Sequence, residues 1–536
     1  MRLPAALAPL RHTLFRLLWG ANVVVSLGVW MQSTSAGWLM TSLSPDALMV
    51  SLVQAATIVP VFLFALPAGA IADIVDRRTL ILGTQSWMLA AAVLLTMLTW
   101  AHATTAWTLL ALTFAIGAGS AMNNPAWGSV MAESVPRRDL VQAIALNGVG
   151  FNIARAVGPA LAGFLLLAGG PALTFGLNAA SYLAVIGVLL TWRRRRHADG
   201  LPREHFLSAI KAGTRFVRHT PPMRAAIWRA TVYFAPGAAP WAMLPLVVRE
   251  QLQEGAGIYG VLLGLMGVGG VTAGLILPQL RMRFSRSNLV LFASLLSYGG
   301  MAVLGVSRHW MVAGLGMLMF GLGWVTTASI TQGAAQMAAP SWVRARALAI
   351  YQLSFNFALA MGTFFWGWLG TQVGLTTSML SASVVGSVLA VAARGISIDA
   401  ADISFSSDAA VMPSVEAVAP ELAPTLAAAR GRVLESQHYR IAPGSKDEFL
   451  RAMVDVRGAR ARGGAVQWHL GEDIHAPEHW VELWWVETWT DHLREAGRLS
   501  ESDRAALARA MAFHVKGDLP ATRRFLSINP QRPPVV

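Results

Sequence analysis

The side chain with the clearest chemical potential in this sequence is an arginine inside a long apolar run. Arg155 lies fifteen residues after Leu140 in the apolar run 140–168, which places it roughly 22 Å along a helix that rises about 1.5 Å per residue. At that depth in a bilayer a charge costs at least a few kcal/mol unless it faces water or a partner. Since no other apolar run carries a charge near its middle, we expect an anionic or oxygen-rich ligand to pair with Arg155. The alternative is a structural arginine held by backbone carbonyls and Asn152.

Amide side chains inside the apolar runs form a second group that could bind a ligand. Polar groups within membrane-spanning segments usually face the interior of the protein. The alternative for about half of them is a purely structural role, in which they join neighbouring helices by hydrogen bonds. We expect six of these amides to lie with Arg155 at a ligand-binding site: Asn22, Gln54, Asn152, Gln332, Gln352 and Asn356.

The elements that hold these side chains are predicted from composition and hydropathy. The 536 residues are 55% hydrophobic and 13% charged, whereas about 25% of the residues in a soluble chain are charged. Most of the chain is therefore predicted to lie in lipid. Runs of about 20 apolar residues, the length that crosses a bilayer, occur twelve times. They are residues 14–40, 47–72, 79–100, 106–132, 140–168, 172–192, 226–248, 256–280, 288–306, 310–337, 345–370 and 374–393.

The charged residues between these runs predict the orientation of the helices. Residues 1–396 contain 26 Lys and Arg against nine acidic residues, and the cations gather in alternate loops. Loops rich in Lys and Arg stay in the cytoplasm, so both termini are predicted to be cytoplasmic. A basic chain can also bind nucleic acid, but this requires an exposed stripe of cations. Because the cations here are separated by apolar runs, we expect no nucleic-acid partner.

Cysteine is absent from the sequence. This excludes disulfides, thiolate metal ligands and cysteine nucleophiles. No Walker motif is present either, which argues against direct use of ATP. We predict no catalytic residue, no metal site and no cofactor.

An internal repeat predicts two related halves. Shifting the sequence by 204 residues aligns 128–163 with 332–367 without a gap, and nine positions are identical. The identical pairs include Phe151 with Phe355 and Asn152 with Asn356. Because membrane proteins that move solutes are often built from duplicated halves, we expect an all-α membrane protein of two six-helix halves.

A short motif after the run 47–72 resembles the signature loop of the major facilitator superfamily. Gly69 is followed four residues later by Asp73 and then by the basic pair Arg77 and Arg78. The glycine allows close helix contact, and Asp73 can accept hydrogen bonds from the N-terminus of a facing helix. The resemblance implies a major facilitator fold in which these four residues gate the cytoplasmic side. Asp76 stands where that family often has a second glycine, which predicts a looser turn.

Two further segments resemble a narrower branch of that superfamily, the transmembrane secretion effectors, which contains the enterobactin exporter. The resemblance is carried by residues 125–138, which include Glu133, and by residues 145–163. Gly158 and Pro159 also resemble the helix 5 motif linked to export in antiporters, where small residues and a proline bend the helix. Glu133, Gly158 and Pro159 are therefore added to the predicted gate.

The resemblance implies a transporter rather than an enzyme. Such a protein exports a small organic molecule (siderophore, drug or secondary metabolite) by alternating access, with proton antiport as its energy source. It lies in the bacterial inner (plasma) membrane, and its partners are the small-molecule substrate and membrane lipid. The alternatives are import, or a membrane-anchored enzyme or ligand sensor that acts through the C-terminal residues.

Composition also predicts the domain boundaries. The halves are 1–192 and 226–396, joined by a basic cytoplasmic connector at 193–225. The connector contains a predicted amphipathic helix at 205–219, which either lies on anionic lipid or is part of an ordinary basic loop. Residues 397–428 are rich in Ser, Ala, Pro and Asp, a composition that predicts a flexible linker.

The last segment, 429–536, is predicted to be a cytoplasmic α+β domain. Strands near 432–441, 465–471, 479–489 and 523–528 alternate with helices in the order β-α-β-β-α-β, which is typical of a ferredoxin-like fold. The segment resembles small ferredoxin-like domains related to antibiotic-biosynthesis monooxygenases, which pair into α+β barrels, and this resemblance implies a homodimer. Tryptophans and histidines are frequent in it, but no metal-ligand spacing or carboxylate pair is evident.

Overall fold

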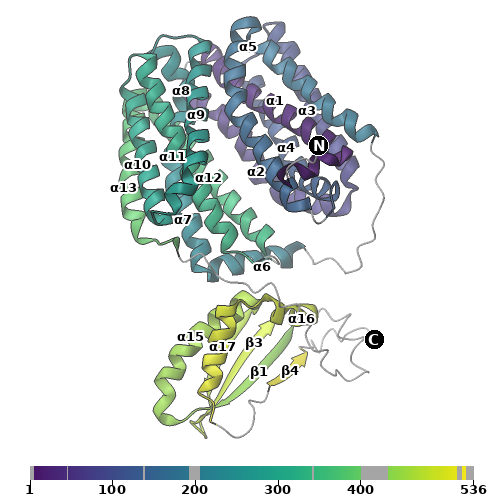
Figure 1. The fold of residues 1–536 in the computed structure, drawn as a ribbon, viewed down its shortest axis with the longest axis vertical. Helices are drawn as coiled ribbons and strands as arrows, with labels where there is room; N and C mark the ends of the chain where they lie inside the picture. Colours follow the sequence, from purple (N-terminus) through teal and green to yellow (C-terminus); the bar gives the residue numbers. More distant parts are fainter. Residues whose placement is uncertain are drawn as a thin grey trace. The chain divides into compact units, whose positions relative to one another are not determined.

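The computed structural model describes residues 5–44, 46–136, 139–191, 206–340, 343–399, 432–515 and 522–526 (Figure 1). The chain divides into two compact units. The first comprises residues 1–200, 228–331 and 352–396, and the second comprises residues 201–227, 332–351 and 397–536. Most of the predicted linker lies outside the described residues, since only 397–399 are described.

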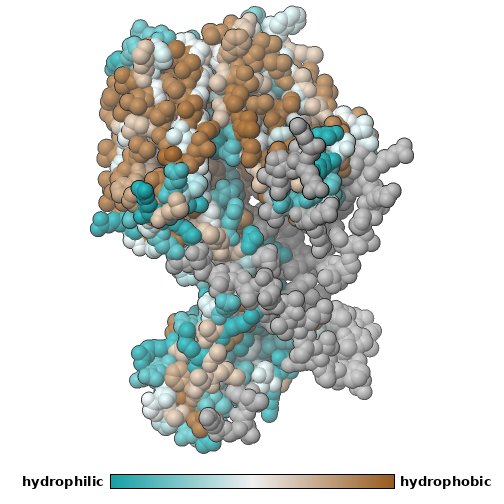
Figure 2. Space-filling view, in the orientation of Figure 1, coloured by the Kyte–Doolittle hydropathy of each residue, from teal (hydrophilic) through white to brown (hydrophobic). Residues whose placement is uncertain are grey.

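Long apolar helices make up the first unit, and residues 221–227, 332–337 and 344–351 of these helices are assigned to the second unit. Among the described residues, eleven helical segments are long and apolar enough to cross a membrane. Phe164, Leu167 and Leu275 are 69%, 68% and 73% exposed, and Figure 2 shows apolar residues over the outside of the helices. A continuous apolar surface of this kind is expected in contact with lipid. The helices are α1 (Thr13–Leu43), α2 (Ala47–Ile74), α3 (Arg77–Trp100), α4 (Ala106–Glu133), α5 (Leu140–Thr191), α7 (Pro221–Gly237), α8 (Ala239–Leu246), α9 (Ala256–Arg281), α10 (Arg286–Val306), α11 (Trp310–Met337), α12 (Arg344–Val373) and α13 (Leu375–Ala392).

Helix α5 contains two of the predicted spans. Its 52 residues would measure roughly 78 Å at about 1.5 Å per residue, more than twice the hydrocarbon thickness of about 30 Å. The helix is broken at Gly169 and Gly170, and Gly170 has φ of +68°. Glycine adopts this left-handed conformation without strain, and Pro171 begins the next helical segment. The spans 140–168 and 172–192 are thus separated by a tight turn.

The prolines of the predicted span 226–248 interrupt its helix. Helix α7 ends one residue after Pro236, and α8 begins one residue before Pro240. A π-helical turn, Val247–Gln251, follows Pro245. Proline lacks the N–H that an α-helix needs and clashes with the preceding turn, which accounts for the change in helix geometry at each site.

The second unit contains helix α6 (Phe206–His219), which matches the predicted helix 205–219, and a small sheet. The four strands form one antiparallel sheet in the order β2-β3-β1-β4. Each strand lies within three residues of its predicted position. The elements are β1 (Val433–Arg440), α15 (Lys446–Gly463), β2 (Gln467–Glu472), β3 (His479–Val486), α16 (Trp489–Arg498), α17 (Glu501–Ala512) and β4 (Thr522–Leu526).

One face of this sheet forms the core of the C-terminal domain. Side chains alternate between the two faces of a strand. On the buried face, Tyr439 and Trp480 pack in one cluster with Phe449 and Met453 of α15. Trp484 packs in a second cluster with Val433 and Val486. The carboxylates of Glu435 and Glu482 are on the same face and are also buried. Buried carboxylates require partners, and the domain supplies them as described below.

Candidate functional site

Arg155 lies on the side of α5 that faces away from the exposed apolar surface. Successive residues are about 100° apart around a helix of 3.6 residues per turn, so Arg155 is opposite the exposed side chains of Ile153, Val157 and Phe164. On one flank of Arg155, Gly158 packs against Trp30 of α1, and on the other flank Gly163 packs against α9. Arg155 is only partly buried between these two contacts. It therefore points toward the interior of the helical unit.

No hydrogen bond or ion pair to Arg155 occurs within the described ranges. The sequence left open a structural arginine held by Asn152, but the Asn152 amide donates to the Gly148 carbonyl of its own helix at 2.8 Å instead. A guanidinium has five N–H donors. The geometry therefore leaves these donors for water or a ligand.

The six predicted binding amides occupy different environments. Asn22 donates to Asn147 across α1 and α5 at 3.0 Å, which joins two helices. Asn356 donates to the Gln352 carbonyl at 2.8 Å, repeating the bond made by Asn152. The structure thus brings none of these amides into hydrogen-bond contact with Arg155. Asn152 shares its interior side of α5, while Gln54 is partly buried in α2 and Gln332 and Gln352 are exposed.

An unbroken series of aromatic contacts, which the sequence did not predict, runs through the first unit. Phe151 contacts Trp30 of α1, and Trp30 contacts Trp241 of α8, with ring centroids 6.3 Å apart in both pairs. Trp241 and Trp324 of α11 are 5.8 Å apart. Phe234 of α7 then lies 4.7 Å from Trp324 and 4.4 Å from Phe355 of α12. We call these six residues the aromatic chain.

A buried amide pair in the first unit was also missed. Asn178 of α5 donates to the side chain of Gln32 of α1, and it also donates to the Tyr182 hydroxyl at 3.3 Å. All three side chains are buried. Because each polar group has a partner within this cluster, its clearest role is to join α1 to α5.

The predicted gate residues are only partly described. Gly69 and Asp73 lie in α2, where the structure describes no more than their helical backbone. Arg77 at the start of α3 forms an ion pair with Glu133 at the end of α4. Arg78 donates to the Leu189 carbonyl of α5 at 2.7 Å. Three helix ends are therefore joined at this loop.

Asp76 does not loosen the turn as its departure from the family motif predicted. It is the N-cap of α3, and its side chain accepts hydrogen bonds from the backbone N–H groups of Arg78 and Thr79 at 3.1 and 3.2 Å. Such caps satisfy N–H groups that have no partner within the helix. The turn is therefore anchored by a side chain that a glycine would lack.

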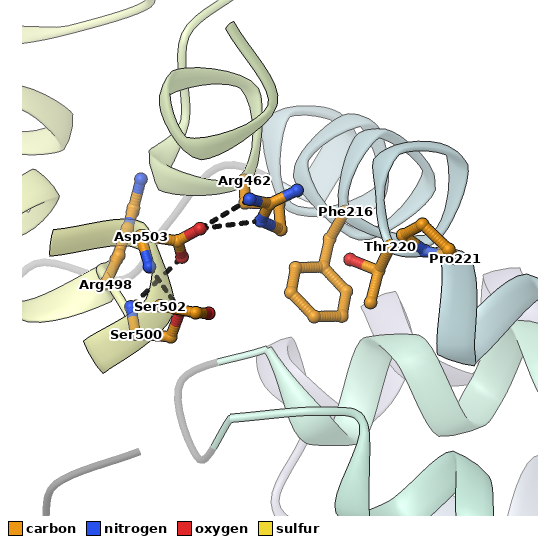
Figure 3. Close-up of a pocket in the computed structure, with 8 residues that line it drawn as sticks. All are labelled: Phe216, Thr220, Pro221, Arg462, Arg498, Ser500, Ser502 and Asp503. Carbon is orange, nitrogen blue, oxygen red and sulfur yellow. Dashed lines mark hydrogen bonds and ion pairs between the residues drawn. The ribbon is translucent and has the colours of Figure 1, made fainter. Parts of the chain in front are cut away.

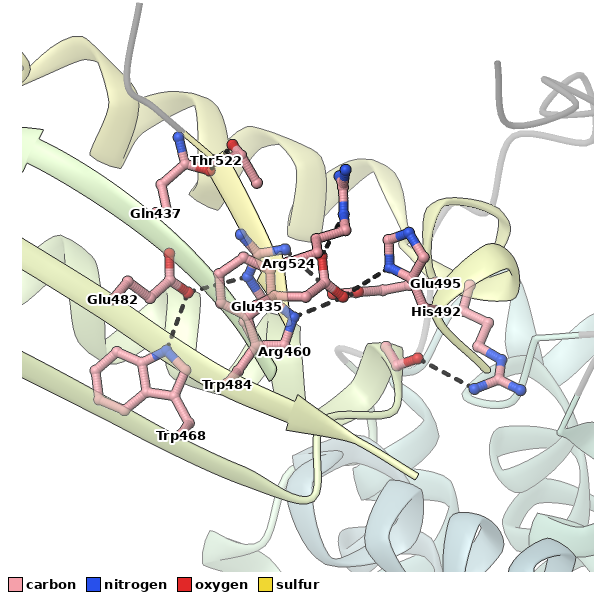
Figure 4. A network of polar contacts seen from close by, with 12 residues as sticks. Glu435, Gln437, Arg460, Trp468, Glu482, Trp484, His492, Glu495, Thr522 and Arg524 are labelled. Carbon is pink, nitrogen blue, oxygen red and sulfur yellow. Dashed lines mark hydrogen bonds and ion pairs between the residues drawn. The ribbon is translucent and has the colours of Figure 1, made fainter. Parts of the chain in front are cut away.

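The C-terminal domain encloses a network of charged side chains (Figure 4). The Arg460 guanidinium donates to Glu482 at 3.0 Å and to Glu495 at 3.1 Å, and it lies 3.6 Å from the centroid of the Trp484 ring. Glu482 also accepts from Trp468 at 3.0 Å and from Tyr439 at 2.8 Å. Each charge thus has several partners, as burial requires.

The same network continues to a third carboxylate, Glu435 on β1. Glu435 contacts His492 at 2.7 Å and accepts from Arg524 at 3.2 Å. Burial raises the pKa of Glu435, but His492 and Arg524 outweigh this effect, so that its pKa is lowered. Burial also raises the pKa of Glu495, and here the effect exceeds the opposing charge of Arg460. The two neighbouring carboxylates therefore differ in their readiness to ionise.

Glu435, His492 and Glu495 each place a potential metal-ligand atom within 4.8 Å of the others. Arg524 and Arg460 already pair with the two carboxylates, so the arrangement favours an ion-pair network over a cation site. No carboxylate pair is evident in the sequence of this segment, but the structure brings carboxylate oxygens of Glu435 and Glu495 to within 4.8 Å of each other. Glu435 and His492 are 57 residues apart in sequence, and only the fold of β1 against α16 brings them together.

Helix α6 is bound by the C-terminal domain (Figure 3). Arg215 donates to the Gly464 carbonyl at 2.5 Å, and Arg462 donates to the His219 carbonyl at 3.1 Å. The bond from Arg462 gives a partner to a carbonyl at the C-terminus of α6, where the helix dipole favours a cation. Phe216 faces the same interface and is 2% exposed. In the described part of α6, protein rather than lipid thus covers this apolar side chain.

Comparison with solved structures shows which fold the chain has. A bacterial homolog of the human lysosomal transporter Spinster, in an inward-facing and unoccupied conformation, matches with a TM-score of 0.59 and 13% identity over 75% of this chain and 98% of that one. A variant of the nucleoside transporter NupG matches with a TM-score of 0.60 and 12% identity over 72% and 99%. At these identities the likeness shows the fold, which is that of a membrane transporter.

The sequence comparison then identifies the family. Residues 4–532 match the transmembrane secretion effectors, and the chain belongs to this family of major facilitator transporters. The staphyloferrin A transporter of Staphylococcus aureus is 23% identical over 296 residues, which cover 55% of this chain and 74% of that one. The predictions of a multi-pass membrane transporter and of a protein that is not an enzyme are confirmed by this membership.

Proposed function

We propose that this transporter exports a small, oxygen-rich anionic molecule of the siderophore type and that Arg155 binds it. The observation that carries the proposal is a guanidinium on the interior side of α5 with no protein partner in the described residues. A buried arginine remains charged and presents a planar fork of donors that suits carboxylate, phenolate or catechol-type oxygens. The name of the Staphylococcus aureus relative, a siderophore transporter, supports the same substrate class.

The transport cycle in this proposal is alternating access between two six-helix halves, 1–192 and 226–396. The turn at Gly169 and Gly170 supports a count of twelve spans, since it divides α5 into two helices of spanning length. The matching bonds of Asn152 and Asn356 support the duplication, because residues 204 positions apart make the same local contact. The proposal also includes proton antiport as the energy source of transport. Both termini are cytoplasmic in it, and the protein lies in the bacterial inner membrane.

The gate in this proposal is the loop that joins α2 to α3, with Gly69, Asp73, Arg77 and Arg78, together with Glu133 of α4. The ion pair between Arg77 and Glu133 supports this role, because it connects two helix ends and can break when they separate. Gly158 and Pro159 contribute by allowing α5 to approach α1 closely, and Gly158 lies against Trp30.

For the C-terminal domain, 429–536, we propose a ferredoxin-like module that dimerises and regulates transport. The strand order β2-β3-β1-β4 supports the fold, and the two hydrogen bonds to α6 support regulation through the connector. A ligand sensor is the second candidate function, and the polar residues around Phe216, namely Arg462, Ser500 and Ser502, favour it. Sedimentation of residues 430–529 at micromolar concentration tests dimerisation, and a monomer contradicts it.

The direction and substrate of transport are tested together. The compound that accumulates in cells lacking this protein is identified first, and its uptake is then measured in inverted and in right-side-out membrane vesicles. Export predicts uptake into inverted vesicles that depends on an imposed proton gradient. Uptake that occurs only in right-side-out vesicles contradicts export and indicates import.

A further inference from the structure

The aromatic chain has the symmetry of the internal repeat. Phe151 and Phe355, its two ends, are an identical pair in the repeat with a shift of 204 residues, and the same shift places Phe234 opposite Trp30. The ring contact of Phe151 with Trp30 is thus repeated by the contact of Phe355 with Phe234. Trp241 and Trp324 connect the two pairs. The chain therefore joins the two halves through their equivalent helices.

Arg155 lies beside the N-terminal end of this chain. Phe151 and Gly158 are four residues before and three residues after Arg155, so all three share one side of α5. Both Phe151 and Gly158 contact Trp30. Arg155 therefore lies on α5 between the two points at which Trp30 contacts the helix. The position equivalent to Arg155 in the second half is Leu359, so the charge occurs on one side only.

Trp241 adds a free hydrogen-bond donor to these rings. Its indole Nε1 is buried and has no hydrogen-bond partner in the part of the chain that the structure describes. A buried donor without a partner costs free energy, on the order of 1–3 kcal/mol, and a tryptophan N–H normally finds a partner when it is buried. This N–H is therefore suited to an acceptor supplied by a ligand.

We propose that Trp30 and Trp241 form the aromatic part of the substrate site and that the site selects an anion carried on a planar, conjugated ring. The proposal rests on the function proposed above, in which Arg155 binds the anionic group. The rings of Trp30 and Trp241 then stack on the planar part of the substrate, and the Trp241 N–H donates to one of its oxygens. Ring stacking and a charge-assisted hydrogen bond act on different atoms of the ligand, so each can be tested separately.

The test uses the purified full-length protein in lipid nanodiscs and two probes of equal charge. One probe is 2-naphthoate, which is planar, and the other is its saturated analogue decahydro-2-naphthoate, which is not. Calorimetry measures the dissociation constant of each. We expect the wild type to bind 2-naphthoate about tenfold more tightly, an effect of the size that aromatic stacking provides. Trp30→Leu abolishes this preference and leaves the affinity for the saturated probe unchanged. Trp241→Leu also abolishes the preference but weakens the saturated probe as well, because the N–H donor to the carboxylate is lost with the ring. Trp241→Phe loses the same donor and keeps most of the preference for the planar probe.

The controls separate this inference from the proposed function. Arg155→Ala is expected to lose both probes, and Trp107→Leu, at an exposed helix end, is expected to change neither. Equal affinities for the two probes, both dependent on Arg155, overturn the aromatic site alone. Binding that persists in Arg155→Ala, or no binding of either probe to the wild type, overturns the anion site as well. If Trp30→Leu weakens both probes equally, the aromatic chain only holds the halves together.

Discussion

An arginine on the interior side of the membrane helices and a buried arginine in the C-terminal domain have opposite surroundings. Arg460 in the C-terminal domain has two carboxylates and an aromatic ring around it, whereas Arg155 in α5 has none of these among the described residues. Removing a charge from water is costly in both places, and a paired charge recovers that cost within the protein. The difference favours a structural role for Arg460 and supports the ligand-binding role proposed for Arg155.

A third arginine shows that the first unit can also satisfy such a charge. Arg229 of α7 is 3% exposed and donates to the carbonyls of Ile396 and Arg394 at 2.9 and 3.2 Å. Helix ends have carbonyls without partners inside the helix, and Arg229 binds them there. Since a structural arginine is possible in this unit, the lack of partners at Arg155 is not a general property of membrane helices. Arg229 is therefore the matched control for Arg155.

The largest expected effect is the loss of transport in Arg155→Ala. This change removes a desolvated charge, so the melting temperature stays the same or rises, while transport of an anionic substrate per folded molecule is abolished. Arg155→Lys keeps the charge without the planar fork and retains part of the binding. Arg229→Ala should do the reverse, with less folded protein and normal transport per molecule. Normal transport by Arg155→Ala after correction for abundance removes Arg155 from the site.

The second effect is a loss of stability in Arg460→Ala. Removing one partner of a buried ion pair leaves the other charge without compensation, and the typical cost is about 3–5 kcal/mol. Denaturant unfolding of the C-terminal domain measures this cost. Arg509→Ala is the control, because the ion pair of Arg509 with Asp455 is exposed and such pairs contribute about 0–1 kcal/mol. A similar loss in the free energy of unfolding for Arg460→Ala and Arg509→Ala would show that Arg460 contributes no more than an exposed arginine.

An intermediate effect is expected at the cytoplasmic loop. Arg77→Ala or Asp73→Asn should leave the protein inserted and its substrate affinity nearly unchanged, but slow transport strongly, because in the proposed gate these residues stabilise one conformation without touching the substrate. The exchange of charges in Arg77→Glu with Glu133→Arg should restore part of the rate, since the ion pair between α3 and α4 is remade. Unchanged turnover in Arg77→Ala contradicts a gating role.

The smallest effect concerns the pH dependence of the two neighbouring carboxylates. The lowered pKa of Glu435 contributes stability that is present above the unfolded value and is lost as pH falls through the folded value. Glu435→Gln should therefore destabilise the domain at pH 7 and converge with the wild type in acid. The pKa of Glu495 is raised, so its contribution to the stability of the domain has the opposite pH dependence and is lost as pH rises. Urea unfolding of both Gln variants at pH 3 and pH 7 compares them, and parallel curves contradict the opposite shifts.

Hydropathy and local patterns in the sequence predicted the elements of this protein well. The apolar runs agree with helix bounds to within a few residues for most spans, and the same is true of α6 and of the four strands. These features depend on interactions between residues close in the chain, namely helix and strand periodicity and the length that spans lipid. The depth of Arg155 follows from the same counting along a helix.

The partners of each side chain depended on the tertiary structure. The aromatic chain draws residues from six helices, and the network of Arg460 joins all four strands and two helices of the C-terminal domain. A sequence pattern does not show which residues meet across such distances. The sequence around Arg155 and Arg460 therefore could not show that, among the described residues, Arg460 has three partners and Arg155 has none. That difference arises from the packing of segments that are far apart in sequence.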